Sequence, residues 1–206
     1  ECRRVTVEEC VFRNLRRKAI HMNGGASNLI ARCDIYDTGT GGVTLGGGDR
    51  KTLMPAGHVL EDTHIRRFSV HQLTYASALH FSGVGNVARH NLIHDAPHQA
   101  ISMHGNNHLF EYNVVSNVCM ASDDAAAFYK GRNPSCRGNV LRYNLWSEIG
   151  SPRGHGNAAV YFDDGDGGET VYGNLFFRCG DPGKGSFGTV FSHGGHGNTV
   201  DNCVFI

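Results

Sequence analysis

Three stretches share one pattern: Phe-Glu-Tyr-Asn-Val-Val at residues 110–115, Leu-Arg-Tyr-Asn-Leu-Trp at residues 141–146 and Val-Tyr-Gly-Asn-Leu-Phe at residues 171–176. An apolar residue is followed by two others, then Asn, then a segment that ends on an apolar residue. The pattern recurs along the chain with Asn, Cys or Thr in the fourth place. These fourth places are Cys10, Cys33, Thr63, Asn91, Asn113, Asn144, Asn174 and Cys203. Their mean spacing of about 28 residues is typical of a repeat architecture.

A second short apolar segment lies in each of the first seven repeats. These segments are residues 19–22, 42–45, 78–81, 100–103, 127–129, 159–162 and 189–191. Their apolar residues follow a period of two, which is typical of strands buried on one face. Two or three short strands per repeat predict an all-β right-handed parallel β-helix, a solenoid of about eight coils. We expect residues 1–206 to form a single domain.

The four Asn residues of the pattern indicate an asparagine ladder, in which an inward Asn at a coil bend bonds to backbone and to the Asn one coil above. This structural role is favoured over a catalytic one. No polar capping helix is evident at either end. Since uncapped coils expose strand edges, we expect the native protein to be longer, with one or both ends truncated here.

Composition excludes several classes of protein. The 206 residues include 19 Lys and Arg against 19 Asp and Glu, so a nucleic-acid partner is not expected. No run of 18 apolar residues is present, so no membrane span is expected. The seven cysteines show no zinc-site spacing and are read mostly as buried apolar residues, with Cys119, Cys136 and Cys179 as the better disulfide candidates. We expect a monomer.

In a β-helix the inward side chains are buried, so function depends on outward positions and loops. The outward residues of the second segment are His21, Thr44, His80, Ser102, Tyr129 and Tyr161. Just past its end come Asn23, Ser82, His104, Lys130, Asp163 and His193. Stacking places them in rows whose aromatic and polar groups suit a polysaccharide or oligosaccharide. The alternative is an ordinary solvated sheet face.

Acidic residues cluster at residues 122–132 and 160–168, in neighbouring coils. Glycoside hydrolysis uses two carboxyl groups about 5 to 9.5 Å apart, which makes Asp124, Asp163 and Asp164 the candidate catalytic residues. If both strands are straight, however, seven residues separate Asp124 from Asp163, roughly 23 Å. The pair then requires a bulge or a register shift. Turn formation is the alternative role of residues 163–166, and a calcium loop there remains open, although no metal or cofactor is expected.

Histidines and cations flank these segments. His98 and His104 are candidates for general acid–base catalysis or for orienting a carboxylate. Residues 90–104 also hold further histidines and an Asp, but without regular zinc-ligand spacing. Lys130 and Arg132 are candidates for holding a substrate carboxylate or lowering the pKa of a neighbouring one.

The motifs of residues 89–101, 124–132, 137–144 and 160–174 resemble those of glycoside hydrolase family 141 and its β-helix relatives. The resemblance covers roughly residues 58–180. It implies secreted (extracellular or periplasmic) enzymes acting on fucose-containing pectin or xylan through two Asp residues. By motif position these are Asp124 and either Asp163 or Asp164. The chain departs from the family pattern at Asn133, where an Asp is expected, and at Ala126, where a Gly is expected.

The leading hypothesis is therefore a glycosidase acting on a plant or algal cell-wall polysaccharide. Its catalytic residues are Asp124, Asp163 and Asp164, with His80, His98, His104, Tyr129, Lys130, Arg132 and Tyr161 as substrate-binding residues. A polysaccharide lyase or epimerase acting on uronate polymers is the first alternative, with His104 or Lys130 as the base. A non-catalytic β-helix that binds carbohydrate or serves as a structural stalk is the second.

Overall fold

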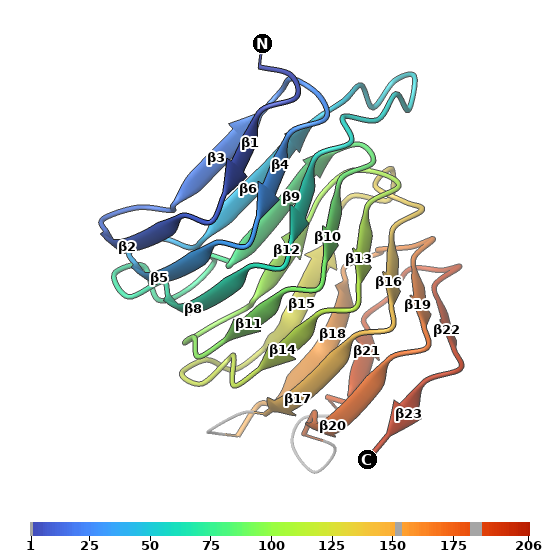
Figure 1. Ribbon diagram of the computed structural model, residues 1–206. Helices are drawn as coiled ribbons and strands as arrows, with labels where there is room; N and C mark the ends of the chain where they lie inside the picture. Colours follow the sequence, from blue (N-terminus) through green and yellow to red (C-terminus); the bar gives the residue numbers. More distant parts are fainter. Residues whose placement is uncertain (1, 151–153, 182–186) are drawn as a thin grey trace.

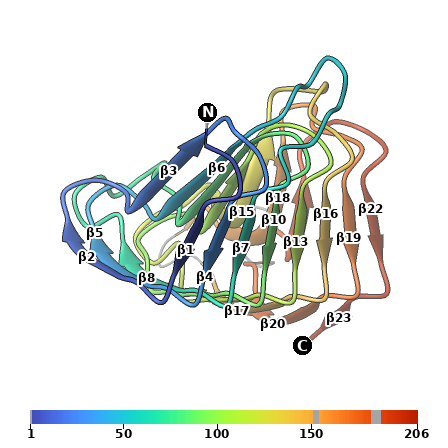
Figure 2. The ribbon, with the colours of Figure 1, turned by 45° about the horizontal axis from the view of Figure 1, so that its top comes forward.

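The computed structural model describes residues 2–150, 154–181 and 187–206. Within these ranges the regular secondary structure consists of β-strands alone, and all pairing between the strands is parallel. The strands form three sheets that wind as a right-handed parallel β-helix of eight coils, which confirms the predicted fold. Figure 1 shows the coils stacked in chain order from blue to red, and Figure 2 shows the same stack with the chain ends at opposite ends of it.

Each sheet takes every third strand of the chain. The first sheet is β1 (Thr6–Glu8), β4 (Leu29–Ala31), β7 (Val59–Glu61), β10 (Val87–Arg89), β13 (Leu109–Glu111), β16 (Val140–Arg142), β19 (Thr170–Tyr172) and β22 (Thr199–Asp201). The second is β2 (Val11–Leu15), β5 (Asp34–Thr38), β8 (His64–Phe68), β11 (Leu92–His94), β14 (Val114–Ser116), β17 (Leu145–Ile149), β20 (Leu175–Cys179) and β23 (Val204–Phe205). The third is β3 (Ile20–Asn23), β6 (Val43–Gly47), β9 (Leu79–Gly83), β12 (Ile101–Met103), β15 (Ala125–Gly131), β18 (Asn157–Asp163) and β21 (Val190–Ser192).

The core is a column of apolar side chains along the solenoid axis. Trp146 stacks on Phe176, which occupies the same position one coil later, with ring centroids 6.3 Å apart, and it also contacts Phe110 of the first sheet at 5.7 Å. Phe176 in turn stacks on Phe205. A single coil cannot bury these rings, so the fold depends on neighbouring coils.

The asparagine ladder is present between the first and second sheets. The side-chain oxygens of Asn113, Asn144 and Asn174 each accept a hydrogen bond from the backbone N–H of the ladder residue one coil earlier, at 2.9–3.0 Å. Thr63 donates in the same way to Asn91. The ladder residues are buried, so these bonds satisfy backbone groups that water cannot reach.

A second ladder, which the sequence pattern did not indicate, precedes the first sheet. The backbone N–H groups of His58 and His108 donate to the side-chain oxygens of Asn86 and Asn139, and that of Asn86 donates to Nδ1 of His108. Burial lowers the pKa of His108 to about 4, so its ring is neutral and its nitrogen accepts. Alternation of Asn with His hides this ladder from a search for a single repeated residue.

The seven cysteines are free thiols, and Cys33, Cys119 and Cys136 are buried. The better disulfide candidates, Cys119, Cys136 and Cys179, are therefore not bridged. No helix in the described ranges is long and apolar enough to cross a membrane.

Candidate functional site

The outer face of the third sheet carries one continuous row, which we call the outer row. Strand register places one residue of each coil beside the next. Its members are His21, Thr44, His80, Ser102, Tyr129, Tyr161 and Phe191. The first six were predicted to share this face. A second row two residues further along includes Ser82 and Gly131, and Gly131 lies beside Asp163.

Asp163 is the most strongly held carboxylate on this face. Its side chain is only 9% exposed, although it lies at the end of β18. The Tyr129 hydroxyl donates to Oδ2 at 2.7 Å, while Nδ1 of His193 and the Asp164 amide lie 3.0 and 2.8 Å from Oδ1. Burial by itself raises the pKa of Asp163, but hydrogen bonds from two tyrosines, His193 and a backbone amide outweigh it and hold the pKa below its usual range. Asp163 is therefore ionised at neutral pH.

Tyr129 and Tyr161 are hydrogen-bond donors at this site. Their rings meet edge to face with centroids 5.5 Å apart. Burial and the Asp163 carboxylate raise the pKa of both hydroxyls, so both remain protonated over the physiological range. The charge of Asp124 also raises the pKa of Tyr161, which places Asp124 within electrostatic range of the same hydroxyl.

The register separates the two catalytic candidates along the sheet. Ala125 pairs with Asn157, and the Asp124 amide donates to the carbonyl of Gly156, so Asp124 lies level with the start of β18 and Asp163 at its end. The strand is not straight between them. Ala127 and Phe128 are consecutive yet both belong to the core, which interrupts the in–out alternation. Asp124 itself has a positive φ of 51°.

An apolar cluster outside the core lies along the outer face between these acids. It contains Ala126, Ala158, Tyr161 and Phe187, with Tyr129 and Phe191 packed against it. Phe187 and Phe191 contact each other with ring centroids 4.5 Å apart, and each ring also contacts Tyr161. Tyr161 and Phe187 are only 5% and 3% exposed, so the aromatic rings of this cluster that a sugar could contact are those of the partly buried Tyr129 and Phe191.

Asp164 is exposed and forms an ion pair with Arg132, with Oδ2 and Nε 2.9 Å apart. Asp163, Asp164 and His193 each offer one ligand atom within 4.8 Å of the others, and they are the residues of the described ranges that could hold a metal ion together. Any such ion would compete with Tyr129 and His193 for the oxygens of Asp163.

Lys130 does not lie on the outer face of the third sheet. It was expected just past the end of the strand, but β15 continues to Gly131, and Lys130 points into the coil with its side chain 1% exposed. Its ammonium contacts Asp166, lies 3.0 Å from Oε1 of Glu169 and donates to the Cys136 carbonyl at 2.7 Å. Burial raises the pKa of Glu169 to about 7, although Lys130 opposes the shift. Gly131 takes the outward position instead, and it packs so closely on Asp163 that a Cβ there would lie 2.7 Å from the Asp163 carbonyl oxygen.

Of the three candidate histidines, His80 and His104 lie side by side. His80 is in the outer row, with Nδ1 2.7 Å from the Ser102 hydroxyl, and burial lowers its pKa to about 4. His104 is exposed after β12, with its ring 5.6 Å from that of His80. Desolvation, Lys130 and Arg50 lower the pKa of His104, so it is neutral. His98 is buried before β12, and its ring lies 5.0 Å from that of Tyr75.

A cleft with a volume of about 780 Å³ is hollowed into the N-terminal half of the same face; we call it the basic cleft. Its lining residues are Arg17, Lys18, His21, Thr40, Gln72, Tyr75, Ala76, Ser77, His80 and Ser102. Arg17, Lys18 and Tyr75 were not predicted as site residues. They lie in the connections before β3 and β9, outside the repeating pattern, so no periodic signal marks them.

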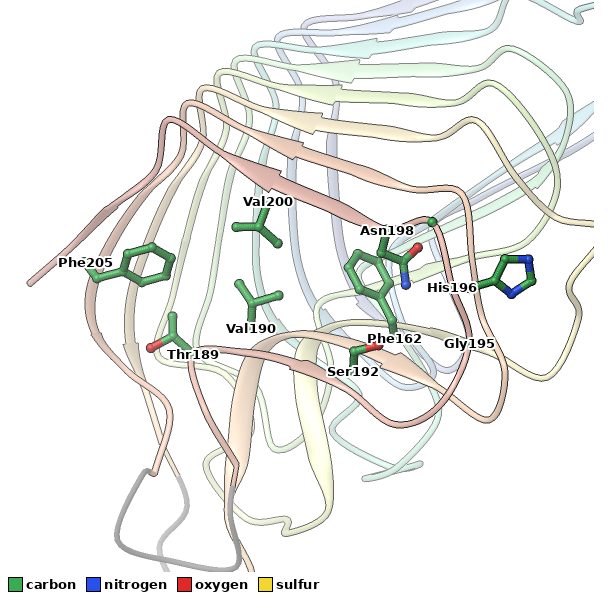
Figure 3. A pocket seen from close by; sticks show the side chains of 10 residues that line it. Phe162, Thr189, Val190, Ser192, Gly195, His196, Asn198, Val200 and Phe205 are labelled. Carbon is green, nitrogen blue, oxygen red and sulfur yellow. The ribbon is translucent and has the colours of Figure 1, made fainter.

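Another cavity, of about 620 Å³, opens at the last coil (Figure 3). Val190, Val200 and Phe205 of β21, β22 and β23 converge on it. These side chains occupy core positions of their strands, so the cavity is the inside of the solenoid and not part of the outer face.

Comparison with models of known protein families, with curated proteins and with solved structures found no match to this chain.

Proposed function

We propose that the protein is a glycoside hydrolase that cleaves a plant or algal cell-wall polysaccharide, fucose- or xylose-containing, outside the cell. The observation that carries the proposal is the state of Asp163, an ionised and nearly buried carboxylate on the outer face, hydrogen-bonded to the partly exposed Tyr129. A carboxylate of this kind acts as the nucleophile or as the base that activates water.

The second carboxyl group of the mechanism is Asp124. It is exposed at the far side of the aromatic cluster and acts electrostatically on Tyr161, the residue that also bonds to Asp163. The register places Asp124 and Asp163 at opposite ends of β18, so the mechanism requires the interrupted alternation at Ala127 and Phe128 to bring both carboxyl groups to one sugar ring. Asp124 then donates the proton to the leaving oxygen. Asp164 is paired with Arg132 and is assigned to positioning the substrate, not to proton donation.

Tyr129 and His193 support Asp163 without reacting. Their hydrogen bonds favour the charged form of the carboxylate and fix its orientation. Tyr129 and Tyr161 stay protonated and are therefore hydrogen-bond donors, not bases.

Polysaccharide elimination is the second candidate, and the neutral, exposed His104 favours it. Its imidazole is free to accept a proton, and Arg50 lies within electrostatic range to balance a uronate carboxylate. Lys130 is excluded as the base because its ammonium is buried in an ion pair.

Product chemistry separates the two candidates. Xylans, fucose-containing pectins and homogalacturonan are each incubated with the protein. We expect new reducing ends without absorption in the near ultraviolet, as hydrolysis requires. An unsaturated product absorbing in the near ultraviolet would instead establish elimination. No new reducing end on any of these polymers would remove support for catalysis and favour a carbohydrate-binding β-helix.

A further inference from the structure

We infer that the basic cleft is a subsite for an anionic sugar, one that carries a carboxylate or a sulfate ester. The inference deepens the proposed function, on which it rests, because it names the class of substrate that the outer face takes. It follows from the charge, the polar groups and the position of the cleft.

The cleft has a floor and two walls. His21, His80 and Ser102 form its floor as members of the outer row. One wall is the segment that leaves β2, with Arg17 and Lys18. The other is the long connection between β8 and β9, with Gln72 and Tyr75.

The charge of the cleft is positive, and protein carboxylates do not neutralise it. None of its lining residues is acidic. Asp37, which lines the adjoining hollow together with Arg17, is already held by two hydrogen bonds from Arg67. Neither Arg17 nor Lys18 has an ion-pair partner in the described part of the chain.

At least seven of the fourteen described arginines form an ion pair with an acid. Examples are the pairs Arg66–Asp34, Arg89–Glu61, Arg142–Glu111 and Arg178–Glu148. Arg17 and Lys18 are among the described cations without such a partner, and both line the cleft. Adjacent cations without partners on the wall of a cleft leave a charge that an anion from solution neutralises.

Lys18 is poised to bind such an anion. It is partly buried, and its ammonium donates to the Thr44 hydroxyl at 2.7 Å. Burial lowers its pKa, which reflects the absence of a counter-charge. An anionic group in the cleft would supply that counter-charge.

The remaining groups are those that bind sugar hydroxyls and ring faces. Tyr75 is 73% exposed, so its ring is available for stacking. The neutral His80 and the hydroxyl of Ser102 lie on the floor, and Thr40, Gln72 and Ser77 add polar groups. The cation pair gives the site its preference for an anion, and these neutral groups give it a preference for carbohydrate.

The cleft and Asp163 belong to one continuous surface. From His80 the outer row passes through Ser102 and Tyr129 to Tyr161, three strand spacings or roughly 14 Å. A polysaccharide lying across the coils therefore reaches from the basic cleft to the acids, with its anionic sugar distant from the bond that is cleaved.

The test is a binding experiment on the Asp163→Asn variant of the whole chain, which removes turnover. Calorimetry compares three probes of equal length: hexagalacturonate, a κ-carrageenan hexasaccharide and neutral xylohexaose. We expect one or both anionic probes to bind more tightly than xylohexaose, and the preferred one identifies carboxylate or sulfate. Adding Arg17→Gln and Lys18→Met should weaken that binding about tenfold. Arg17→Gln alone, at an exposed position, should weaken it in the same direction, and Arg4→Gln, an exposed cation near β1, should not.

Two outcomes would overturn the subsite. One is xylohexaose binding as tightly as the anionic probes, and the other is unchanged affinity in the Arg17 and Lys18 variants. Neither outcome affects the proposed hydrolase, which is judged on product formation by the unmodified chain. Conversely, charge-dependent binding without any cleavage would support the anionic subsite and contradict the proposed hydrolase activity.

Discussion

The Tyr129 hydroxyl lies 2.7 Å from Oδ2 of Asp163, although the two residues are 34 positions apart in the chain. They meet because Tyr129 on β15 pairs with Tyr161 on β18, and Asp163 is the next outward residue after Tyr161. One coil thus supplies the carboxylate and its neighbour supplies a donor that keeps it charged. The site is a product of stacking and exists in no single repeat.

Replacement of Tyr129 by Phe should shift the pH dependence of catalysis. Loss of the hydroxyl removes a hydrogen bond that lowers the pKa of Asp163. The pKa therefore rises, and the acid limb of kcat/KM should move to higher pH. The measurement is a pH–rate profile, with Tyr112→Phe on the first-sheet side as the control. An unmoved acid limb would show that Tyr129 does not set the charge of Asp163.

Replacement of Asp124 by Asn should remove proton donation to the leaving group. We expect kcat to fall by about 100-fold or more, with a smaller loss on substrates whose leaving group needs no proton. Kinetics on a natural glycan and on an aryl glycoside with an acidic phenol provide this comparison. Equal losses on both substrates would argue against Asp124 as the acid.

Replacement of Lys130 by Met should destabilise the fold in a pH-dependent manner. The change leaves Asp166 and Glu169 buried without their cation, at a cost of roughly 3–5 kcal/mol near pH 8. The loss should be smaller near pH 5, where the carboxyl groups of the variant are protonated. Denaturant unfolding at both pH values tests this, with the exposed Arg178→Met as a control expected to cost at most about 1 kcal/mol. A small, pH-independent loss would contradict the buried ion-pair assignment.

Replacement of Glu169 by Gln should reduce the pH dependence of wild-type stability. The pKa of Glu169 is about 7 in the folded state, above its ordinary value of 4.5. The folded state therefore binds the proton more tightly, so this residue favours folding below pH 4.5 and loses that contribution as pH rises to about 7. The loss of this contribution lowers the Tm of the wild type as the pH rises from 5 to 8, and the variant lacks this effect. Over this range the Tm of the variant should therefore rise relative to that of the wild type. An identical pH dependence of Tm in the two proteins would be inconsistent with this shift.

Replacement of Asn113 by Leu should show what one ladder position contributes. The amide accepts from the backbone N–H of Asn91 and donates to the Ala88 carbonyl, and both of these groups would be left buried without partners. We expect a loss of about 3 kcal/mol or more. Chemical denaturation measures it, and Asn23→Ala on the exposed end of β3 should change stability by less than about 0.5 kcal/mol. Equal effects at the two positions would refute the structural role.

The solenoid and its outer row were predictable because both follow from periodicity. The spacing of Asn91, Asn113, Asn144 and Asn174 sets the coil length, and alternation then determines which residues face out. The same alternation, extended beyond Phe128, predicts that Lys130 points inward, because Phe128 points inward and Lys130 lies two residues later. The prediction for Lys130 was wrong because the strand was taken to end before it.

Other features of the site depend on contacts that no repeat encodes. The apolar cluster includes Phe187, which lies outside the repeating segments, and the basic cleft uses Arg17 and Tyr75 from irregular connections. Asn133, where the resembled family has an acid, instead accepts hydrogen bonds from the amide and hydroxyl of Ser135 and closes a turn. Such contacts require three-dimensional coordinates.

The most direct test of the central claim is the rate of glycosidic hydrolysis by Asp163→Asn, compared with Asp62→Asn at an exposed position on the first-sheet side. We predict a loss of at least about 100-fold for Asp163→Asn, with thermal unfolding showing that it remains folded, and an unchanged rate for Asp62→Asn. A folded Asp163→Asn variant that hydrolyses the substrate at the wild-type rate would contradict that claim.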